Sequence, residues 1–479
     1  MADAFRAAAE AAGALEVIGL VGQAATEALA HWRAAGEPAE AWMRAEACLY
    51  ALNLVLPKHW GLLDAQAVGH TAELCLEFMT SPQLAACPKL AGTLVVLLGG
   101  IGSQLLAAAS HAEGVHPGRG GGGGGGSPLP ATLVAVLDSL LGLLAQPDDK
   151  LARCAATCVH RLSGSSHIRG FLLAHSPTWP QRLLRVYAGQ GRQPSAEGGE
   201  LSAPDYCLRA LCELRLEREL LQLHVGQASL LLGSACGPAE AEAAAHHLGC
   251  LSVALEQRGS ALDAEALAAV GELLHQASRT GSPALLLQAA CRAAVAVPEP
   301  GMAWALLESM CAPAPAHPAV LAALRELLPA VGQGAVGHGA ALAAVSASLT
   351  TACSSHRLDP DWQESALQLA AACAADLPAA LDAAALAQLL PLAQAAAGSS
   401  HRGACEALAT YCQSACSAAR EGSASEEVRL LAQRMGGGGG APPLVAALLH
   451  AASGGQPSFM IATIAEALYS TWLAVGTER

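Results

Sequence analysis

The sequence predicts an all-α fold in which helical hairpins follow one another in an open array. Hydrophobic residues make up 53% of the chain, yet aromatic residues make up only 3%, and runs of β-branched residues are almost absent. Alanine and leucine dominate the hydrophobic residues, and both favour helices over strands. At 479 residues the chain is also longer than one compact core normally holds, which favours an elongated array or several domains.

The stretch 41–56, AWMRAEACLYALNLVL, gives the clearest single helix. Its apolar residues recur at steps of three and four, the spacing of one helical face: Trp42, Ala45, Leu49, Leu52 and Leu56. Arg44 and Glu46 lie off this stripe, and we expect Pro57 to end the helix because proline cannot continue the hydrogen bonding. One amphipathic helix cannot bury its stripe alone, so the rest of the chain must supply neighbours.

Residues 129–162 show how those neighbours are supplied. One apolar stripe consists of Leu133, Leu137, Leu140, Leu141 and Leu144. After the turn Pro147-Asp148-Asp149, a second stripe consists of Leu151, Cys154, Cys158 and Leu162. Two such helices joined by a short turn form a hairpin of about 35 residues, the size of a HEAT-type repeat. The sequence therefore predicts a right-handed α-solenoid of HEAT-type helical hairpin repeats.

Further helices are predicted along the whole chain, and no segment resembles a strand. They are expected at 4–34, 62–80, 90–109, 168–188, 204–233, 238–257, 262–278, 282–297, 301–311, 316–330, 338–353, 360–376, 380–397, 401–419, 424–434 and 442–475. Pro- and Gly-rich stretches separate them. The prediction is one solenoid over residues 1–479, with flexible low-complexity inserts at about 116–128, 189–203 and 436–441.

The stretch 90–112 is long enough to cross a membrane and carries no charged residue. It is interrupted by several glycines and lies between predicted helical pairs, which is more typical of a buried helix pair than of a membrane span. We therefore expect no membrane insertion. The first residues include Asp3, Arg6 and Glu10, unlike the start of a signal peptide.

The chain is acidic, with a net charge of −14. Nucleic-acid binding needs clustered lysines and arginines, so the composition argues against direct binding of DNA or RNA. An acidic surface is compatible with basic protein partners, although a solvated acidic face without any specific partner is the commoner explanation. The 16 cysteines are scattered along apolar faces and, in an intracellular protein, are expected to pack as small buried residues.

Glycine-rich stretches give no nucleotide site. Residues 332–337, GQGAVG, match GxGxxG, but a dinucleotide site needs a preceding β-strand, and residues 321–330 have a helical pattern instead. The glycine runs 120–126 and 436–440 lack the Lys-Ser/Thr pair of a phosphate-binding loop. We predict no cofactor.

Cysteines, histidines and carboxylates form no recognisable metal or catalytic site. The pairs Cys154/Cys158 and Cys412/Cys416, together with Cys405, have helical spacing rather than the CxxC knuckles of structural zinc, even though His160 is near the first pair. The dipeptide His246-His247 belongs to no metal-binding motif. Carboxylates at Asp148-Asp149 and Glu426-Glu427 begin predicted helices, where they complement the helix dipole. We predict no catalytic, cofactor-binding or metal-binding residues and no enzymatic activity.

Residues 42–50, WMRAEACLY, resemble the W-R-x-x-E-A-C-L-Y/F helix of the importin-β superfamily, in its importin-thirteen/transportin-three (transportin-SR) branch. Three later stretches resemble further helices of that family in the same order. They are Lys89–Leu106, Val136–Leu162 with the family's cysteine near Cys158, and Gly454–Leu473. The resemblance covers the middle and C-terminal part of such a receptor.

The resemblance implies a nuclear transport receptor, or a fragment of one, that shuttles between cytoplasm and nucleus. It implies import of basic or Arg/Ser-rich protein cargo, release by Ran-GTP, and contacts with nucleoporins. The polyglycine inserts depart from the family pattern. No N-terminal arch precedes Ala41, so we expect the main Ran-contact region to be missing from this chain.

The matched motifs are packing motifs, so no contact residue for Ran or cargo carries over. The alternative reading is a cytoplasmic HEAT- or armadillo-type interaction scaffold without a transport role.

Overall fold

The computed structural model describes residues 2–34, 41–81, 84, 87–114, 129–190, 201–233, 237–258, 263–279, 283–297, 299–311, 317–331, 338–421, 443–452 and 460–476. All regular elements in these ranges are helical, and none of them is a strand. The structure therefore confirms the all-α prediction. The chain divides into two compact units, Met1–Arg218 and Glu219–Arg479, each of which is described by itself.

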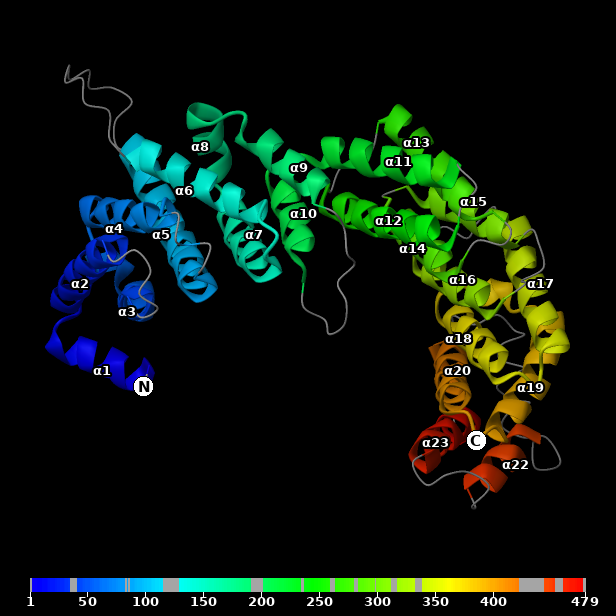
Figure 1. Cartoon of the computed structure of the whole chain (residues 1–479). Coiled ribbons are helices and arrows are strands. Elements are labelled where there is room, and N and C mark those ends of the chain that lie inside the picture. Colours follow the sequence, from blue (N-terminus) through cyan, green and yellow to red (C-terminus); the bar gives the residue numbers. More distant parts are fainter. Residues whose placement is uncertain are drawn as a thin grey trace. The chain divides into compact units, whose positions relative to one another are not determined.

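Unit 1 is a double layer of helices (Figure 1). Layer B consists of α3, α5, α7 and α10, each packed against the next, and layer A consists of α2, α4, α6 and α9. The bounds are α1 Ala2–Ala12, α2 Ala14–Ala34, α3 Ala41–His59, the 3-10 turn η1 Trp60–Leu62, α4 Ala65–Met79, α5 Pro88–Gly114, α6 Leu129–Leu144, α7 Asp149–Ser163, α8 Ile168–His175, α9 Trp179–Gly189 and α10 Ala203–Glu213.

Unit 2 repeats the same arrangement. Its layer B is α12, α14, α16, α18, α20 and α23, and its layer A is α13, α15, α17, α19 and α22. The bounds are α11 Glu217–Gly233, α12 Pro238–Arg258, α13 Ala264–Ala277, α14 Ala284–Ala296, α15 Pro300–Cys311, α16 Pro318–Val331, α17 Gly339–Ser355, α18 Pro360–Asp376, η4 Pro378–Ala380, α19 Ala383–Ala397, α20 Arg402–Glu421, α22 Pro443–His450 and α23 Ile461–Gly476. Each unit is thus an array of HEAT-type hairpins, as the sequence predicts.

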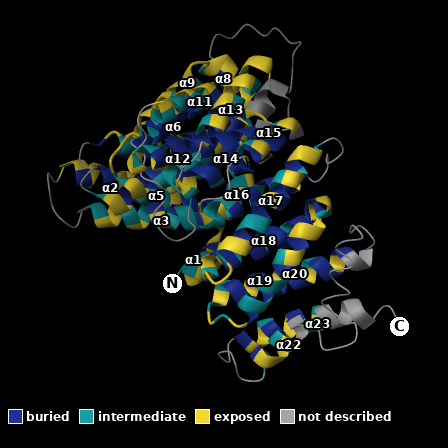
Figure 2. Cartoon of the chain, turned by 90° about the vertical axis from the view of Figure 1, so that its right-hand side faces the viewer, coloured by how far each residue is buried: buried dark blue, intermediate teal, exposed yellow. Residues whose placement is uncertain are grey.

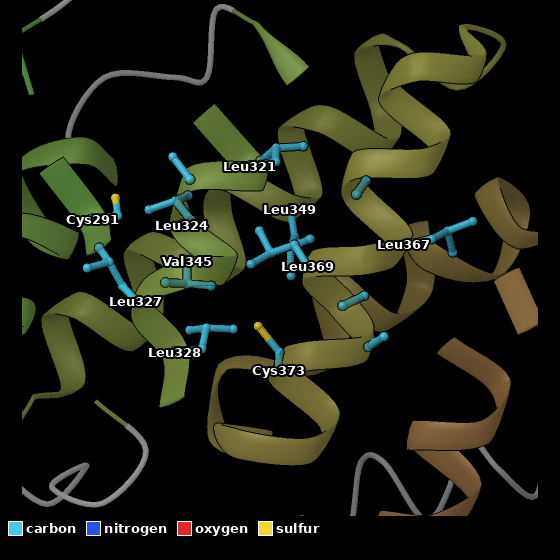
Figure 3. Close-up of a cluster of buried hydrophobic side chains, with 14 of the residues drawn as sticks. Cys291, Leu321, Leu324, Leu327, Leu328, Val345, Leu349, Leu367, Leu369 and Cys373 are labelled. Carbon is cyan, nitrogen blue, oxygen red and sulfur yellow. The ribbon is translucent and has the colours of Figure 1, made fainter. Parts of the chain in front are cut away.

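The core of each unit lies between its two layers. Figure 3 shows this core in unit 2, where Leu324 and Leu327 of α16 meet Val345 and Leu349 of α17. Cys373 of α18 lies in the same cluster, so its thiol serves as a small apolar packing group. In Figure 2, helices such as α18 and α20 turn a buried side inward and an exposed side outward, as amphipathic helices do.

The predicted hairpin at 129–162 is confirmed by α6 and α7, which pack against each other. All five leucines of its first stripe are buried, and of the second stripe only Cys154 is half-exposed. Asp148 begins α7, where its carboxylate accepts hydrogen bonds from the backbone N–H groups of Lys150 (2.9 Å) and Leu151 (3.0 Å). The predicted role of this carboxylate at a helix start is therefore confirmed.

Three predicted helix boundaries are wrong. The opening helix does not end at Pro57, because α3 continues to His59 with Pro57 inside its last turn. The predicted helix 168–188 is two helices, α8 and α9, separated at Ser176–Thr178 around Pro177. The predicted helix 204–233 is also two helices, because Arg215 adopts a left-handed backbone conformation with φ 67°.

The predicted buried helix pair over 90–112 is wrong, because its glycines do not interrupt α5, which runs as one helix from Pro88 to Gly114. By length and composition, α5 is the one helix within the described ranges that could cross a membrane. Its buried residues face α3, α4, α6 and α7, which is how a core helix of an array is placed.

Several sequence predictions lie outside the described residues. These are the inserts 116–128 and 436–441, most of the insert 189–203, the GxGxxG match at 332–337 and the helix 424–434. The single solenoid over 1–479 stays a prediction.

Candidate protein-interaction surface

A ladder of polar side chains crosses layer B of unit 2. Arg325 of α16 donates a hydrogen bond from Nη1 to Oε1 of Gln368 on α18, at 2.5 Å. Gln368 in turn donates from Nε2 to Oε1 of Glu364, at 3.1 Å. The other carboxylate oxygen of Glu364 lies 3.8 Å from Nδ1 of His401, which precedes α20. Polar side chains of three successive repeats are therefore linked on one face, which we call the unit 2 ladder.

The backbone of α20 approaches Glu364 closely because residue 403 is glycine. A side chain at Gly403 would collide with the Glu364 carboxylate. The absent side chain lets this carboxylate lie against the first turn of α20, where the positive end of the helix dipole stabilises a negative charge. Ala404 of the same turn donates its backbone N–H to Nδ1 of His401 at 3.4 Å.

Acidic residues dominate the surroundings of the unit 2 ladder. Arg325 of the ladder lies 3.5 Å from the Glu326 carboxylate, and Arg402 beside the ladder lies 2.6 Å from the Glu406 carboxylate, so both arginines are already paired. Residues 219–479 contain 21 acidic and 10 basic residues, a net charge of −11, whereas residues 1–218 carry a net charge of only −3. The acidity of the chain is therefore concentrated in unit 2.

Cysteines singled out in the sequence are placed as packing residues. Cys158, Cys405, Cys412 and Cys416 are buried, and Cys154 is half-buried. Burial raises the pKa of the Cys158 and Cys405 thiols to about 11, which keeps them protonated at neutral pH.

Histidines do not complete a metal cluster with these thiols. Nδ1 of His160 is buried without a hydrogen bond among the described residues, and the ring lies against Tyr206 with ring centres 5.9 Å apart. His247 contacts His224 with their Nδ1 atoms 3.1 Å apart, and Nε2 of His246 lies 3.5 Å from Sγ of Cys250. Across the described ranges no group of three or more His, Cys, Asp or Glu side chains could hold a metal ion.

The unit 2 ladder was not predicted from the sequence, because its residues form no local motif. A weak signal exists, since Arg325, Glu364 and His401 are separated by roughly one HEAT repeat, about 40 residues. Polar residues that recur at the repeat length, rather than at helical spacing, mark a face shared by successive repeats.

The described architecture defines a protein of the HEAT-type α-solenoid class, and solved structures give it a more particular likeness. The structure of importin 13 in its cytosolic state matches with a TM-score of 0.70 at 13% identity, over 100% of this chain and 53% of that one. The chain therefore spans about half the length of the importin 13 structure.

Two further solved structures superpose on this chain with lower TM-scores. A complex of Kap95p with RanGDP gives a TM-score of 0.35 at 13% identity, over 96% of this chain and 64% of that one. Importin β gives 0.30 at 11% identity, over 96% and 67% respectively. No protein-family model and no curated protein sequence matches the chain. The importin 13 likeness alone supports the fold.

Proposed function

We propose that this chain is a nuclear transport receptor of the karyopherin kind, or a part of one. The observation that carries the proposal is the importin 13 match, which extends over the whole chain at a TM-score of 0.70. The importin-like motifs at 42–50, 89–106, 136–162 and 454–473 add support because they follow the family's order. The proposal includes one continuous solenoid over residues 1–479 and no enzymatic activity.

The proposed cargo is a basic or Arg/Ser-rich protein segment that binds the acidic layer B of unit 2. The net charge of −11 over residues 219–479 attracts such a segment from a distance and speeds encounter. The carboxylates of Glu326, Glu364 and Glu406 lie on α16, α18 and α20, three successive helices of layer B. Arginine pairs with carboxylates in a planar, two-pronged geometry, so an extended Arg-rich segment can contact several repeats at once.

Ran-GTP is proposed to release this cargo, and nucleoporins to carry the receptor between cytoplasm and nucleus. A HEAT array suits such exchange because each repeat contacts only its neighbours, so many weak contacts can be made and lost in steps. We assign no Ran or nucleoporin contact to any residue.

A binding assay tests the proposal directly. The probe is a fluorescent Arg/Ser-rich domain, titrated with the full chain in the presence and absence of GTP-locked Ran. We expect the chain to bind the probe, and we expect binding to weaken at least tenfold when Ran-GTP is added to a chain extended upstream. No binding of the probe would overturn the cargo assignment. Binding that ignores Ran-GTP, even in a chain extended upstream, would instead favour the scaffold without a transport role.

Charge-neutralising variants locate the cargo surface. The variant carrying Glu326→Gln, Glu364→Gln and Glu406→Gln is expected to bind the probe several-fold more weakly. Its matched control carries Glu265→Gln, Glu272→Gln and Glu308→Gln, which remove three exposed charges from layer A of the same unit. Equal losses in both variants would show that net charge alone attracts the probe and that layer B is not its site.

A further inference from the structure

Helix α3 carries a second apolar stripe on the side that faces away from the core. Ala45, Leu49, Leu52 and Leu56 form its buried side, while Met43, Ala47, Tyr50 and Leu54 recur at steps of four and three on the opposite side. Met43 is 51% exposed and Tyr50 is 47% exposed. An exposed helical stripe of this kind is typical of a docking surface, because single exposed apolar residues are common but aligned ones are not.

Helix α5 continues this surface with small side chains. Val96 is 43% exposed, and Gly92, Gly100 and Ser103 lie on the same side of the helix. A side chain added at Gly92 would meet no atom within 4 Å, and one added at Gly100 would meet only the ring of Trp60. The exposed side of α5 therefore carries smaller side chains than the exposed side of α3, and it leaves room for the side chains of a partner.

Basic residues follow on the next two helices of layer B. Arg161 of α7 and Arg209 of α10 are exposed, and neither pairs with a carboxylate among the described residues. The pKa of His160 between them is lowered, first by burial and then by Arg209, with Glu213 acting in the opposite direction and Arg161 adding to the lowering. Two arginines and one exposed glutamate, Glu213, therefore lie around His160.

Side-chain contacts join each neighbouring pair of the four helices α3, α5, α7 and α10. Thr93 of α5 donates a hydrogen bond to Glu46 of α3 at 3.2 Å, and the Cys158 thiol of α7 donates to the Val95 carbonyl of α5 at 3.4 Å. The rings of His160 on α7 and Tyr206 on α10 are in contact. Tyr50, Val96, Arg161 and Arg209 each lie within about one helical turn of one of these contacts, on α3, α5, α7 and α10, and we call these four residues the unit 1 row.

We propose that the unit 1 row binds a helix of a protein partner. One half of this helix carries an apolar stripe, and the other half carries acidic residues. The apolar end would lie over α3 and α5, and the acidic end beside Arg161 and Arg209. Packed helices lie 8 to 10 Å apart, so four of them span about 30 Å, the length of a helix of about 20 residues.

Charge complementarity selects this partner over others. Nucleic acid would need many more cations than the two exposed arginines provide, and it would leave Met43, Tyr50 and Val96 without apolar contacts. A basic segment would be repelled by Arg161 and Arg209. The proposed partner is the electrostatic opposite of the basic cargo proposed for unit 2, and the inference does not depend on the transport function.

The test uses a fluorescent synthetic peptide of about 20 residues, with leucines at helical spacing in one half and glutamates in the other. A second version reverses the two halves, because the direction of binding is open. The peptides are titrated with the full chain at low salt. We expect one direction to bind, with at least tenfold weaker binding when its glutamates are replaced by lysines or its leucines by serines.

Variants of the chain locate the site. We expect Arg161→Glu with Arg209→Glu, and separately Tyr50→Ser with Met43→Ser, to weaken binding at least tenfold. The matched controls are Arg185→Glu on α9 and Leu173→Ser on α8, both exposed and on helices outside layer B. All six residues are exposed, and circular dichroism checks that each variant is folded. If the controls weaken binding as much, or if a single-stranded oligonucleotide binds the same face more tightly than either peptide, the proposal is overturned.

Discussion

The sulfur of Cys158 on α7 occupies the space that a side chain at Gly99 on α5 would need. A Cβ at residue 99 would collide with this sulfur and would lie 2.9 Å from the Cβ of Cys158. The thiol uses the close approach to donate a hydrogen bond to the Val95 carbonyl, 3.4 Å away. One turn on, a Cβ at Gly102 would lie 3.3 Å from the methyl groups of Leu162. The two glycines therefore determine how closely two layer-B helices pack.

Gly99→Ala is expected to destabilise unit 1 by about 1 to 3 kcal/mol, the usual cost of overpacking a core. Gly92→Ala on the same helix is the matched control, because its added methyl meets nothing and alanine favours the helix by about 1 kcal/mol. Urea unfolding followed by circular dichroism measures both. In the double variant Gly99→Ala with Cys158→Ala, the loss should be smaller than the sum of the single losses. Additive losses would mean that Gly99 and Cys158 do not compete for one space.

The glycines of α5 also show what sequence reasoning can and cannot supply. Hydrophobic spacing predicted the stripe on α3 and the hairpin of α6 and α7, because burial imposes helical periodicity directly on the sequence. The same reasoning took the glycines at 99–102 as interruptions of the apolar stretch. Their role depends on a residue 59 positions away, and no local pattern reports that neighbour. Long-range packing and the residues of the unit 2 ladder are therefore visible only in the fold.

Thiol labelling should divide the described cysteines by burial. Burial raises the pKa of Cys75 and Cys207 to about 12, so these thiols are protonated and shielded at neutral pH. The half-buried Cys48, Cys87 and Cys154 are expected to react first with a disulfide reagent, as mapped by peptide mass spectrometry. A metal chelator should change neither this pattern nor the melting temperature. Chelator-dependent exposure of Cys405 or Cys412 would reveal a metal that the packing interpretation does not include.

Asp382 should make the stability of unit 2 depend on pH. Its carboxylate accepts a hydrogen bond from the Ala385 backbone N–H at 2.9 Å, and this bond is the first cause of its lowered pKa. A lowered pKa in the folded state means that the stabilisation is present at neutral pH and is lost as the pH falls below the ordinary value of 3.8. Asp382→Ala should therefore cost about 1 kcal/mol at neutral pH and progressively less in acid.

The control for this pH dependence is Asp376→Asn. Burial raises the pKa of Asp376, so its charge is unfavourable in the folded state and its removal should not destabilise unit 2 at neutral pH. The local stability of α19 and α18 is measured in both variants by hydrogen exchange of peptides from these helices, from neutral pH to below 3.8. A loss in Asp382→Ala that stays constant across this range would exclude the charged cap as its cause.

Helix ends were predicted poorly where the usual residue is missing. The break after α10 has the hydrogen bonds of a Schellman motif, from Leu216 N–H to the Leu211 carbonyl and from Arg215 N–H to the Cys212 carbonyl. Glycine normally occupies the left-handed position of this motif, but here it is Arg215, with φ 67°. Without the glycine signal, residues 204–233 appear as one helix. An ion pair accounts for an arginine at this position, since Nη1 of Arg215 lies 3.7 Å from the buried Glu217 carboxylate.

Arg215→Gly should therefore act differently in two backgrounds. When Glu217 is first changed to Gln, we expect Arg215→Gly to stabilise the chain by about 1 kcal/mol, because glycine relieves the left-handed strain. In the unchanged chain the gain should be smaller or reversed, because the buried Glu217 carboxylate loses its ion pair. Urea unfolding of the four chains of this cycle gives the coupling, and Arg218→Gly, inside α11, is the control that should only destabilise. Equal effects in both backgrounds would show that the ion pair does not hold Arg215 in place.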